Sequence, residues 1–155
     1  SAIRRDYGKP TMPVPDSQPY TAIATAEGLA SIYRRALSGS ILSDGSRDRF
    51  WQTLQRQQDR ALMPRFFDDT VTVAHKTGAI DGVRHDAGVF WVPEVSSAAH
   101  DPMAARGMVR PKGRPIIFVA LSRDLDDRSW SVENAGEAAI GRLARAAFDW
   151  FADHP

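Results

Sequence analysis

The sequence predicts an α/β domain of the α+β type, in which three antiparallel strands are flanked by helices. Two strands are predicted over 71–92, because β-branched and polar residues alternate on both sides of Asp81-Gly82, a dipeptide typical of tight hairpins. A continuous apolar run over 115–121 predicts a third strand that is buried on both faces. Apolar residues at helical spacing before and after these strands predict the flanking helices. The 155 residues suffice for one domain with a core.

An extended lead-in and two helices are predicted for the first third of the chain. Residues 1–20 contain four prolines, which exclude a helix or a central strand. Within 25–60, Thr25 is a good N-cap for a first helix and Gly39 a good stop. A second helix is expected after Ser43. The side chains expected to face the core are Leu29, Ile32, Tyr33, Leu37, Phe50, Trp51 and Leu54.

The strands occupy 70–125 in this prediction, with the hairpin strands at roughly Val71–Thr77 and Arg84–Pro93. Residues 94–114 form a polar connection that is unusually long for neighbouring strands. It is either a flap or contact surface near a site, or a plain surface excursion. A last helix is predicted over 131–152. Its apolar stripe consists of Ile140, Leu143, Ala144, Ala147 and Phe151.

Composition excludes several classes of function. The net charge of +1 gives no reason to expect a nucleic-acid partner, which would require a clustered basic face. There is no cysteine, so disulfides and thiol chemistry are excluded. No apolar run approaches the roughly 20 residues of a membrane helix, and we expect no membrane association. The four histidines have no metal-ligand spacing, so neither a metal nor another cofactor is expected.

The tripeptide Lys76-Thr77-Gly78 ends the first hairpin strand. An ammonium and a hydroxyl on an exposed strand can bind a carboxylate, and a glycine lets a substrate lie close to the backbone. Lys-Thr-Gly on a strand, followed by a hairpin and an Arg, resembles the third signature motif of the class A β-lactamase and penicillin-binding-protein superfamily. The order of the helices and strands resembles the C-terminal half of that fold. The resemblance implies that 1–155 is the C-terminal portion of one such domain.

This resemblance implies a role for each residue of the motif. Lys76 and Thr77 would bind the carboxylate of a β-lactam or acyl-peptide-like substrate, and Gly78 would leave room for it. The backbone N–H of Ala79 would be one donor of an oxyanion hole. Arg84 would add a second positive charge to the carboxylate site. The protein would be periplasmic or secreted if it follows the family.

The charged residues beside the motif also have a structural explanation. Arg84 and His85 are as well explained by a hydrogen-bonded cluster with Asp86 that holds the hairpin. Alternation turns the side chain of His75 away from that of Lys76. We therefore expect His75 to face the core or a helix rather than to act in catalysis.

The family's nucleophile is absent from this sequence. That nucleophile is the Ser of a Ser-x-x-Lys turn, and no Ser here has a Lys three residues later. A Glu-x-x-Leu-Asn arrangement, which would supply a deacylating base, is also absent. The tripeptide starting at Ser43 resembles the family's Ser-Asp-Asn motif, but it lies too close to Lys76 in the chain, and helix capping explains it. The sequence therefore carries half of a site.

The resemblance implies a five-stranded sheet, of which only three strands are predicted here. The strand Pro115–Leu121 would then have an open apolar edge, which invites pairing with another strand. We expect a complementary N-terminal segment or a homo-oligomer across this edge, with the hydrolase activity belonging to the full-length protein. The alternatives are a non-catalytic binding or interaction module of the same fold, and an unrelated α/β domain with a chance Lys-Thr-Gly.

Overall fold

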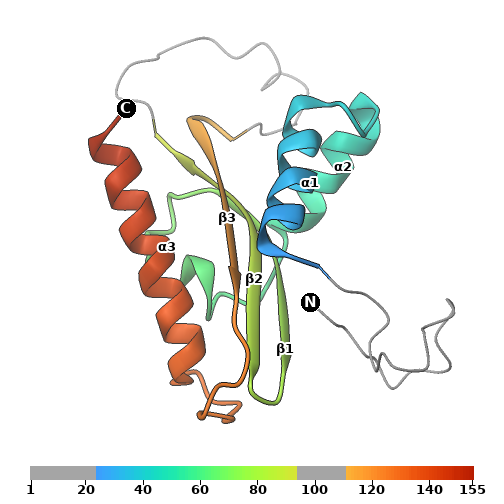
Figure 1. The fold of residues 1–155 in the computed structure, drawn as a ribbon. Helices are drawn as coiled ribbons and strands as arrows, with labels where there is room; N and C mark the ends of the chain where they lie inside the picture. The colour runs from blue at the N-terminus through green and yellow to red at the C-terminus, as the bar shows by residue number, and fades with distance from the viewer. Residues whose placement is uncertain (1–23, 94–110) are drawn as a thin grey trace, which may run out of the picture.

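A computed structural model of the chain describes residues 24–93 and 111–155, which form a three-stranded sheet between two helical layers (Figure 1). The strands are antiparallel neighbours in chain order: β1 (Val73–Ile80), β2 (Val83–Val92) and β3 (Arg114–Leu121). The helices are α1 (Ala26–Ser38), α2 (Asp44–Gln55), the 3-10 helix η1 (Met63–Phe66) and α3 (Ala135–Asp153). The predicted fold class is confirmed.

The ends of the helices follow local capping chemistry. Thr25 Oγ1 accepts the Gly28 N–H at 3.0 Å, and Gly39 ends α1 in a left-handed conformation at φ +75°, so both predicted ends of α1 are confirmed. α3 begins later than predicted. The Asn134 side chain caps it by accepting the backbone N–H groups of Gly136 and Glu137 at 3.0 and 3.2 Å.

Each face of the sheet has its own hydrophobic core. On the α3 face, η1 and α3 pack against the buried residues Val71, Val73, Phe90 and Val92. On the other face, α1 and α2 pack against Ala74, Ala87, Val89 and Trp91. In Figure 1 the sheet stands between α3 on one side and α1 and α2 on the other. Residues on alternate positions of each strand therefore face different helices.

Three details of the predicted core are corrected. Ile32 and Leu143 were expected to be buried, but their side chains are 51% and 60% exposed. β3 was expected to be buried on both faces, but its residues are mostly half-buried. β3 is an edge strand in the described part of the chain, with no strand on its far side. Its flank is therefore open, as the predicted apolar edge required.

The hairpin register runs from Val73 opposite Phe90 to Ile80 opposite Val83. Gly82 closes the turn at φ +69°, where a residue without a Cβ is favoured. The predictions for 1–20 and for most of 94–114 fall on residues outside the described ranges. Within those ranges, no helix has the length and apolar character needed to cross a bilayer.

We predict that Gly88→Ala destabilises the fold. A Cβ at Gly88 would lie 2.3 Å from the carbonyl oxygen of Ala74 and 2.6 Å from the Cα of His75. These are backbone atoms, so β1 would have to move away from β2. We expect a loss of about 1–3 kcal/mol in the free energy of unfolding, the usual cost of overpacking, measured by urea denaturation.

Gly45→Ala is the matched control, because nothing lies within 4 Å of the Cβ it would add. Gly45 lies in α2, where Ala is the better helix former, so this variant should be as stable as the wild type or slightly more stable. Equal stability of the Gly88→Ala and Gly45→Ala variants would contradict the close approach of β1 at Gly88.

Candidate functional site

The Lys-Thr-Gly motif lies on the free edge of the sheet. β1 is the edge strand, and the Thr72 carbonyl just before it accepts the Trp91 N–H of β2 at 3.1 Å. Antiparallel pairing alternates, so Thr77 and Ala79 turn their N–H and C=O groups to the open edge. Lys76 Nζ donates to the Thr77 carbonyl at 2.5 Å, which agrees with this direction. The backbone N–H of Ala79 is therefore on the open side of β1.

Lys76 and Gly78 belong to the sheet face that α1 and α2 cover. Their register partners are Ala87 and His85, and Ala87 lies in the core under α1. Figure 1 shows that the hairpin end of the sheet extends beyond α1 and α2. Lys76 lies towards this end and its side chain is exposed. The motif therefore lies where the helical cover stops.

The Thr77 hydroxyl is oriented by a residue that the sequence analysis missed. Gln57, which follows α2, donates from Nε2 to Thr77 Oγ1 at 3.0 Å. A hydroxyl can accept one hydrogen bond and still donate its own proton. Thr77 therefore keeps a donor for an anionic group. A glutamine in a loop gave no signal of this contact in the sequence.

A buried ion pair lies beneath the motif on the α3 face. His75 Nδ1 lies 2.9 Å from both carboxylate oxygens of Asp86, and the Met63 N–H donates to Asp86 Oδ2 at 2.9 Å. His75 is 2% exposed and Asp86 0%. The prediction that His75 faces the core is confirmed. The predicted cluster of Asp86 with Arg84 and His85 is corrected, since Asp86 binds His75 and η1 instead.

Tyr33 of α1 holds β2 from the opposite face. Its hydroxyl donates to the Ala87 carbonyl at 2.8 Å and is buried. Burial raises the pKa of Tyr33 to about 12, with a smaller contribution from the charge of Asp86. The phenol therefore keeps its proton and remains a donor at neutral pH. Ala87, opposite Lys76 in the register, is thus fixed to α1.

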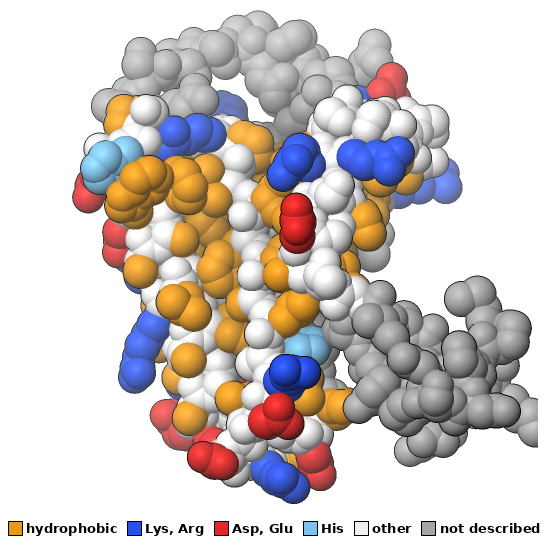
Figure 2. All heavy atoms as spheres, viewed as in Figure 1, with side chains coloured by type: hydrophobic (Ala, Val, Ile, Leu, Met, Phe, Trp, Pro, Cys, Tyr) orange, Lys and Arg blue, Asp and Glu red, His pale blue; other side chains and the backbone are white. Residues whose placement is uncertain are grey.

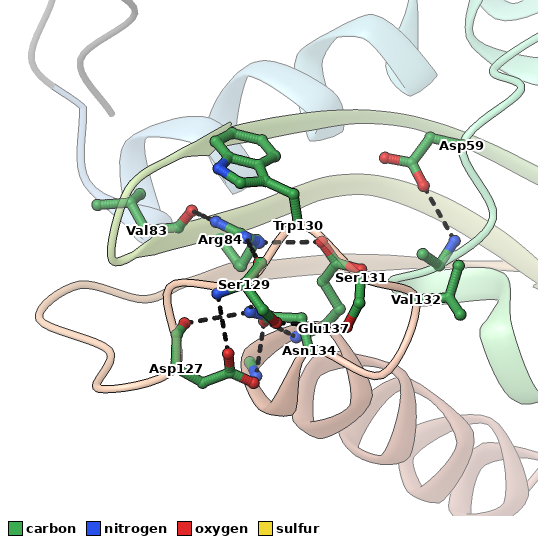
Figure 3. Close-up of polar contacts among 12 residues, drawn as sticks. Asp59, Val83, Arg84, Asp127, Ser129, Trp130, Ser131, Val132, Asn134 and Glu137 are labelled. Carbon is green, nitrogen blue, oxygen red and sulfur yellow. Dashed lines mark hydrogen bonds and ion pairs between the residues drawn. The ribbon is translucent and has the colours of Figure 1, made fainter.

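Arg84 is fully buried and lies at the centre of a polar cluster at the start of α3 (Figure 3). Its Nε donates to Glu137 Oε1 at 2.9 Å, and its guanidinium lies 4.7 Å from the ring centroid of Trp130. Its remaining nitrogens donate to the carbonyl oxygens of Ile80, Val83 and Ser129. Every guanidinium nitrogen therefore has a protein acceptor.

This arrangement corrects the expectation that Arg84 supplies a second positive charge to the carboxylate site. The Arg84 side chain pairs with Glu137 of α3, whereas Lys76 lies on the face covered by α1 and α2. The two cations are on opposite faces of the sheet. Arg84 fastens the hairpin end to α3, and its charge is compensated there.

His85 lies directly across the hairpin from Gly78 and on the same face as Lys76. Its Nδ1 is 2.9 Å from the Arg84 carbonyl oxygen, and the Ser122 N–H lies 3.1 Å from the same ring nitrogen. Burial lowers the pKa of His85, although the hydrogen bond to the Arg84 carbonyl opposes this effect. The imidazole is therefore predominantly neutral at neutral pH. The sequence analysis placed His85 in a structural cluster and missed that it faces the motif.

Metal ligands do not come together in the part of the chain that the structure describes. Within residues 24–93 and 111–155, no three His, Cys, Asp or Glu side chains are grouped so as to hold an ion. The chemistry that these residues can perform is therefore the binding of an anionic group and hydrogen bonding to an oxygen at the β1 edge.

Comparison with solved structures shows the same fold in PBP-A and in β-lactamases. PBP-A, in a mutant form recorded as an acyl-enzyme complex with penicillin G, is 24% identical with a TM-score of 0.61 over 82% of this chain and 39% of its own. A β-lactamase from Sphaerobacter thermophilus is 25% identical, with a TM-score of 0.60 over 85% of this chain and 42% of its own. A β-lactamase from Chitinophaga pinensis is 18% identical, with a TM-score of 0.63 over 81% and 41%.

The chain thus spans about two fifths of the length of these structures. A search of curated protein sequences found no match. The model of the family described as the β-lactamase enzyme family matches residues 3–100, more than half of the chain. With the fold and the family model in agreement, the chain belongs to the β-lactamase enzyme family.

Proposed function

We propose that this chain is the C-terminal portion of a β-lactamase-like serine hydrolase domain and that β1 is its substrate-binding strand. One observation carries the proposal: the free edge of β1 presents Lys76, Thr77, Gly78 and Ala79 where the cover of α1 and α2 ends. In this proposal the domain comprises all of 1–155. The substrate class is a β-lactam or a similar acylated peptide.

The first function of this edge is to bind a carboxylate. The ammonium of Lys76 has three donors, of which the Thr77 carbonyl takes one. The Thr77 hydroxyl, held by Gln57, has its proton available as a second donor type. A carboxylate beside both groups would gain charge-assisted hydrogen bonds, which are the strong ones.

The second function is to stabilise an oxyanion. The N–H of Ala79 projects from the free edge, and an oxyanion hole needs such a donor near the position of the developing charge. A second donor is expected from the segment that carries the nucleophile. Loss of one donor from such a hole costs roughly 10²–10³ in rate. Ala79 alone therefore gives an incomplete hole.

The nucleophile has to come from a segment with a Ser-x-x-Lys turn, which this sequence lacks. PBP-A is recorded as an acyl-enzyme with penicillin G, and we propose the same type of step here: a serine oxygen attacks the lactam carbonyl and the ring C–N bond breaks. The alternative is a non-catalytic binding module of the same fold. The missing Ser-x-x-Lys favours that alternative for this chain by itself.

The open edge of β3 supports a complementary segment or a second copy of the chain as partner. β3 has no strand on its far side among the described residues, and its apolar side chains are half-buried. Figure 2 shows a band of hydrophobic side chains between α3 and α1 on the side from which β3 is seen in Figure 1. An apolar strand edge of this kind pairs readily with another strand.

We predict that Lys76→Met weakens the binding of benzylpenicillin to the folded chain by about 10-fold or more. A hydrogen bond to a charged group contributes about 1.5–3 kcal/mol, which corresponds to this range. Binding is measured by NMR titration of the 15N-labelled chain. Lys112→Met is the control, because it removes the same charge near the start of β3, at the other end of the sheet. Equal affinities for the two variants would contradict the role of Lys76.

We further predict that a fluorescent penicillin does not label the 155-residue chain covalently, whereas it labels a longer protein that includes a Ser-x-x-Lys segment. The chain has no residue of the required type, so it should show no turnover of a chromogenic cephalosporin either. Turnover by the chain alone would show that it is complete. A longer protein that binds benzylpenicillin but is never labelled would support the non-catalytic module.

The open β3 edge predicts self-association of the chain when it is produced alone. Light scattering after size-exclusion chromatography should give a mass above 17.1 kDa that rises with concentration. Adding the complementary segment should convert these species to a single complex. A monomer that is stable across the same concentration range would count against an unmet partner at β3.

A further inference from the structure

His85 occupies a position on the Lys76 face for which the family motif gives no role. It is directly opposite Gly78, and opposing residues of an antiparallel pair have Cβ positions about 4.5–5.5 Å apart. A Cβ built on Gly78 would meet only the Cβ of His85, at 3.8 Å. Among the described residues, the space over Gly78 is therefore bordered by the imidazole and is otherwise open.

Lys76 is the diagonal neighbour of His85 across the hairpin. Such neighbours lie about 7–8 Å apart, within the reach of a long side chain. The lysine ammonium and the imidazole can therefore approach one anionic group from two sides, with Gly78 beneath it.

The hydrogen bonding of His85 leaves one ring nitrogen available. Nδ1 is fixed by the Arg84 carbonyl and the Ser122 N–H, whereas no hydrogen bond to Nε2 is found within the described part of the chain. Ser122 is itself held to Arg84, whose N–H it accepts at 3.0 Å and whose carbonyl receives its hydroxyl proton at 2.5 Å. A histidine fixed through one nitrogen presents the other in a defined direction.

We propose that His85 contacts the carboxylate of the substrate through Nε2, opposite Lys76, in the position that the buried Arg84 does not fill. This inference rests on the proposed function, because it assumes that Lys76 binds a carboxylate. The Ser122 N–H at Nδ1 is compatible with a proton on Nε2, which a carboxylate requires. His85 is thus a ligand-binding residue, and Ser122 is a positioning residue.

Two isosteric substitutions separate ligand contact from a structural role. In His85→Asn, the amide atoms lie near the position of Nδ1, so the contacts with Arg84 and Ser122 have a substitute and Nε2 is lost. In His85→Gln, the terminal amide lies near the position of Nε2. We expect His85→Asn to weaken benzylpenicillin binding by about 3- to 10-fold and His85→Gln to stay within about 2-fold of the wild type.

The second readout is the 15N chemical shift of His85 Nε2 in the wild-type chain. Benzylpenicillin should move this shift towards that of a protonated nitrogen, which a purely structural histidine would not show. Unchanged affinity in His85→Asn together with an unchanged Nε2 shift overturns the inference. If His85→Asn fails to fold, as judged by its thermal melt, the Nε2 shift and the Gln variant decide.

Failure of the proposed function gives a different result. If the folded wild-type chain does not bind benzylpenicillin, the carboxylate site itself is refuted, and the role of His85 with it. If the wild type binds and Lys76→Met loses affinity while His85→Asn does not, the site stands and only the inference about His85 falls.

Discussion

The register of β1 against β2 is the constraint on which every other feature of the site depends. Side chains alternate between faces, so a slip of one residue would move Lys76 and Gly78 to the α3 face and send the N–H of Ala79 towards β2. Two features oppose such a slip. Gly88 lets the backbone of His75 come close, and the buried pair of His75 and Asp86 joins the strands across the α3 face. The orientation of the motif on one face is thus secured by side chains on the other.

The burial of Arg84 follows from the same geometry. A fully buried guanidinium is tolerated only when its charge is paired and its donors are used. The hairpin end provides two carbonyls, the loop before α3 provides a third, and Glu137 provides the countercharge. An Arg at this position therefore ties the tip of the hairpin to the first turn of α3. It cannot also serve a ligand on the opposite face, and this leaves His85 as the polar residue of β2 nearest to Gly78.

The elements themselves could be predicted because local signals agree with the fold. Thr25 and Gly39 bound α1, and Asp81-Gly82 closes the hairpin, each through backbone chemistry that a sequence displays directly. The partners of charged side chains could not be predicted in the same way. Asp86 is adjacent in sequence to His85 but binds His75 from the neighbouring strand, because alternation puts Asp86 and His85 on opposite faces. The contact of Gln57 with Thr77 depends on the path of a loop and left no periodic pattern.

The two open edges of the sheet place opposite demands on whatever completes this chain. β1 and β3 are separated by two strand spacings, about 10 Å, with β2 between them. A single added strand could satisfy the apolar edge of β3, but it would leave the Ala79 N–H and Lys76 without a reactive hydroxyl on the far side. The completing segment must therefore both extend the sheet at β3 and reach around α1 and α2 to the edge of β1. That requirement calls for a substantial body of chain, and the solved relatives have more than half of their length beyond the part matched here.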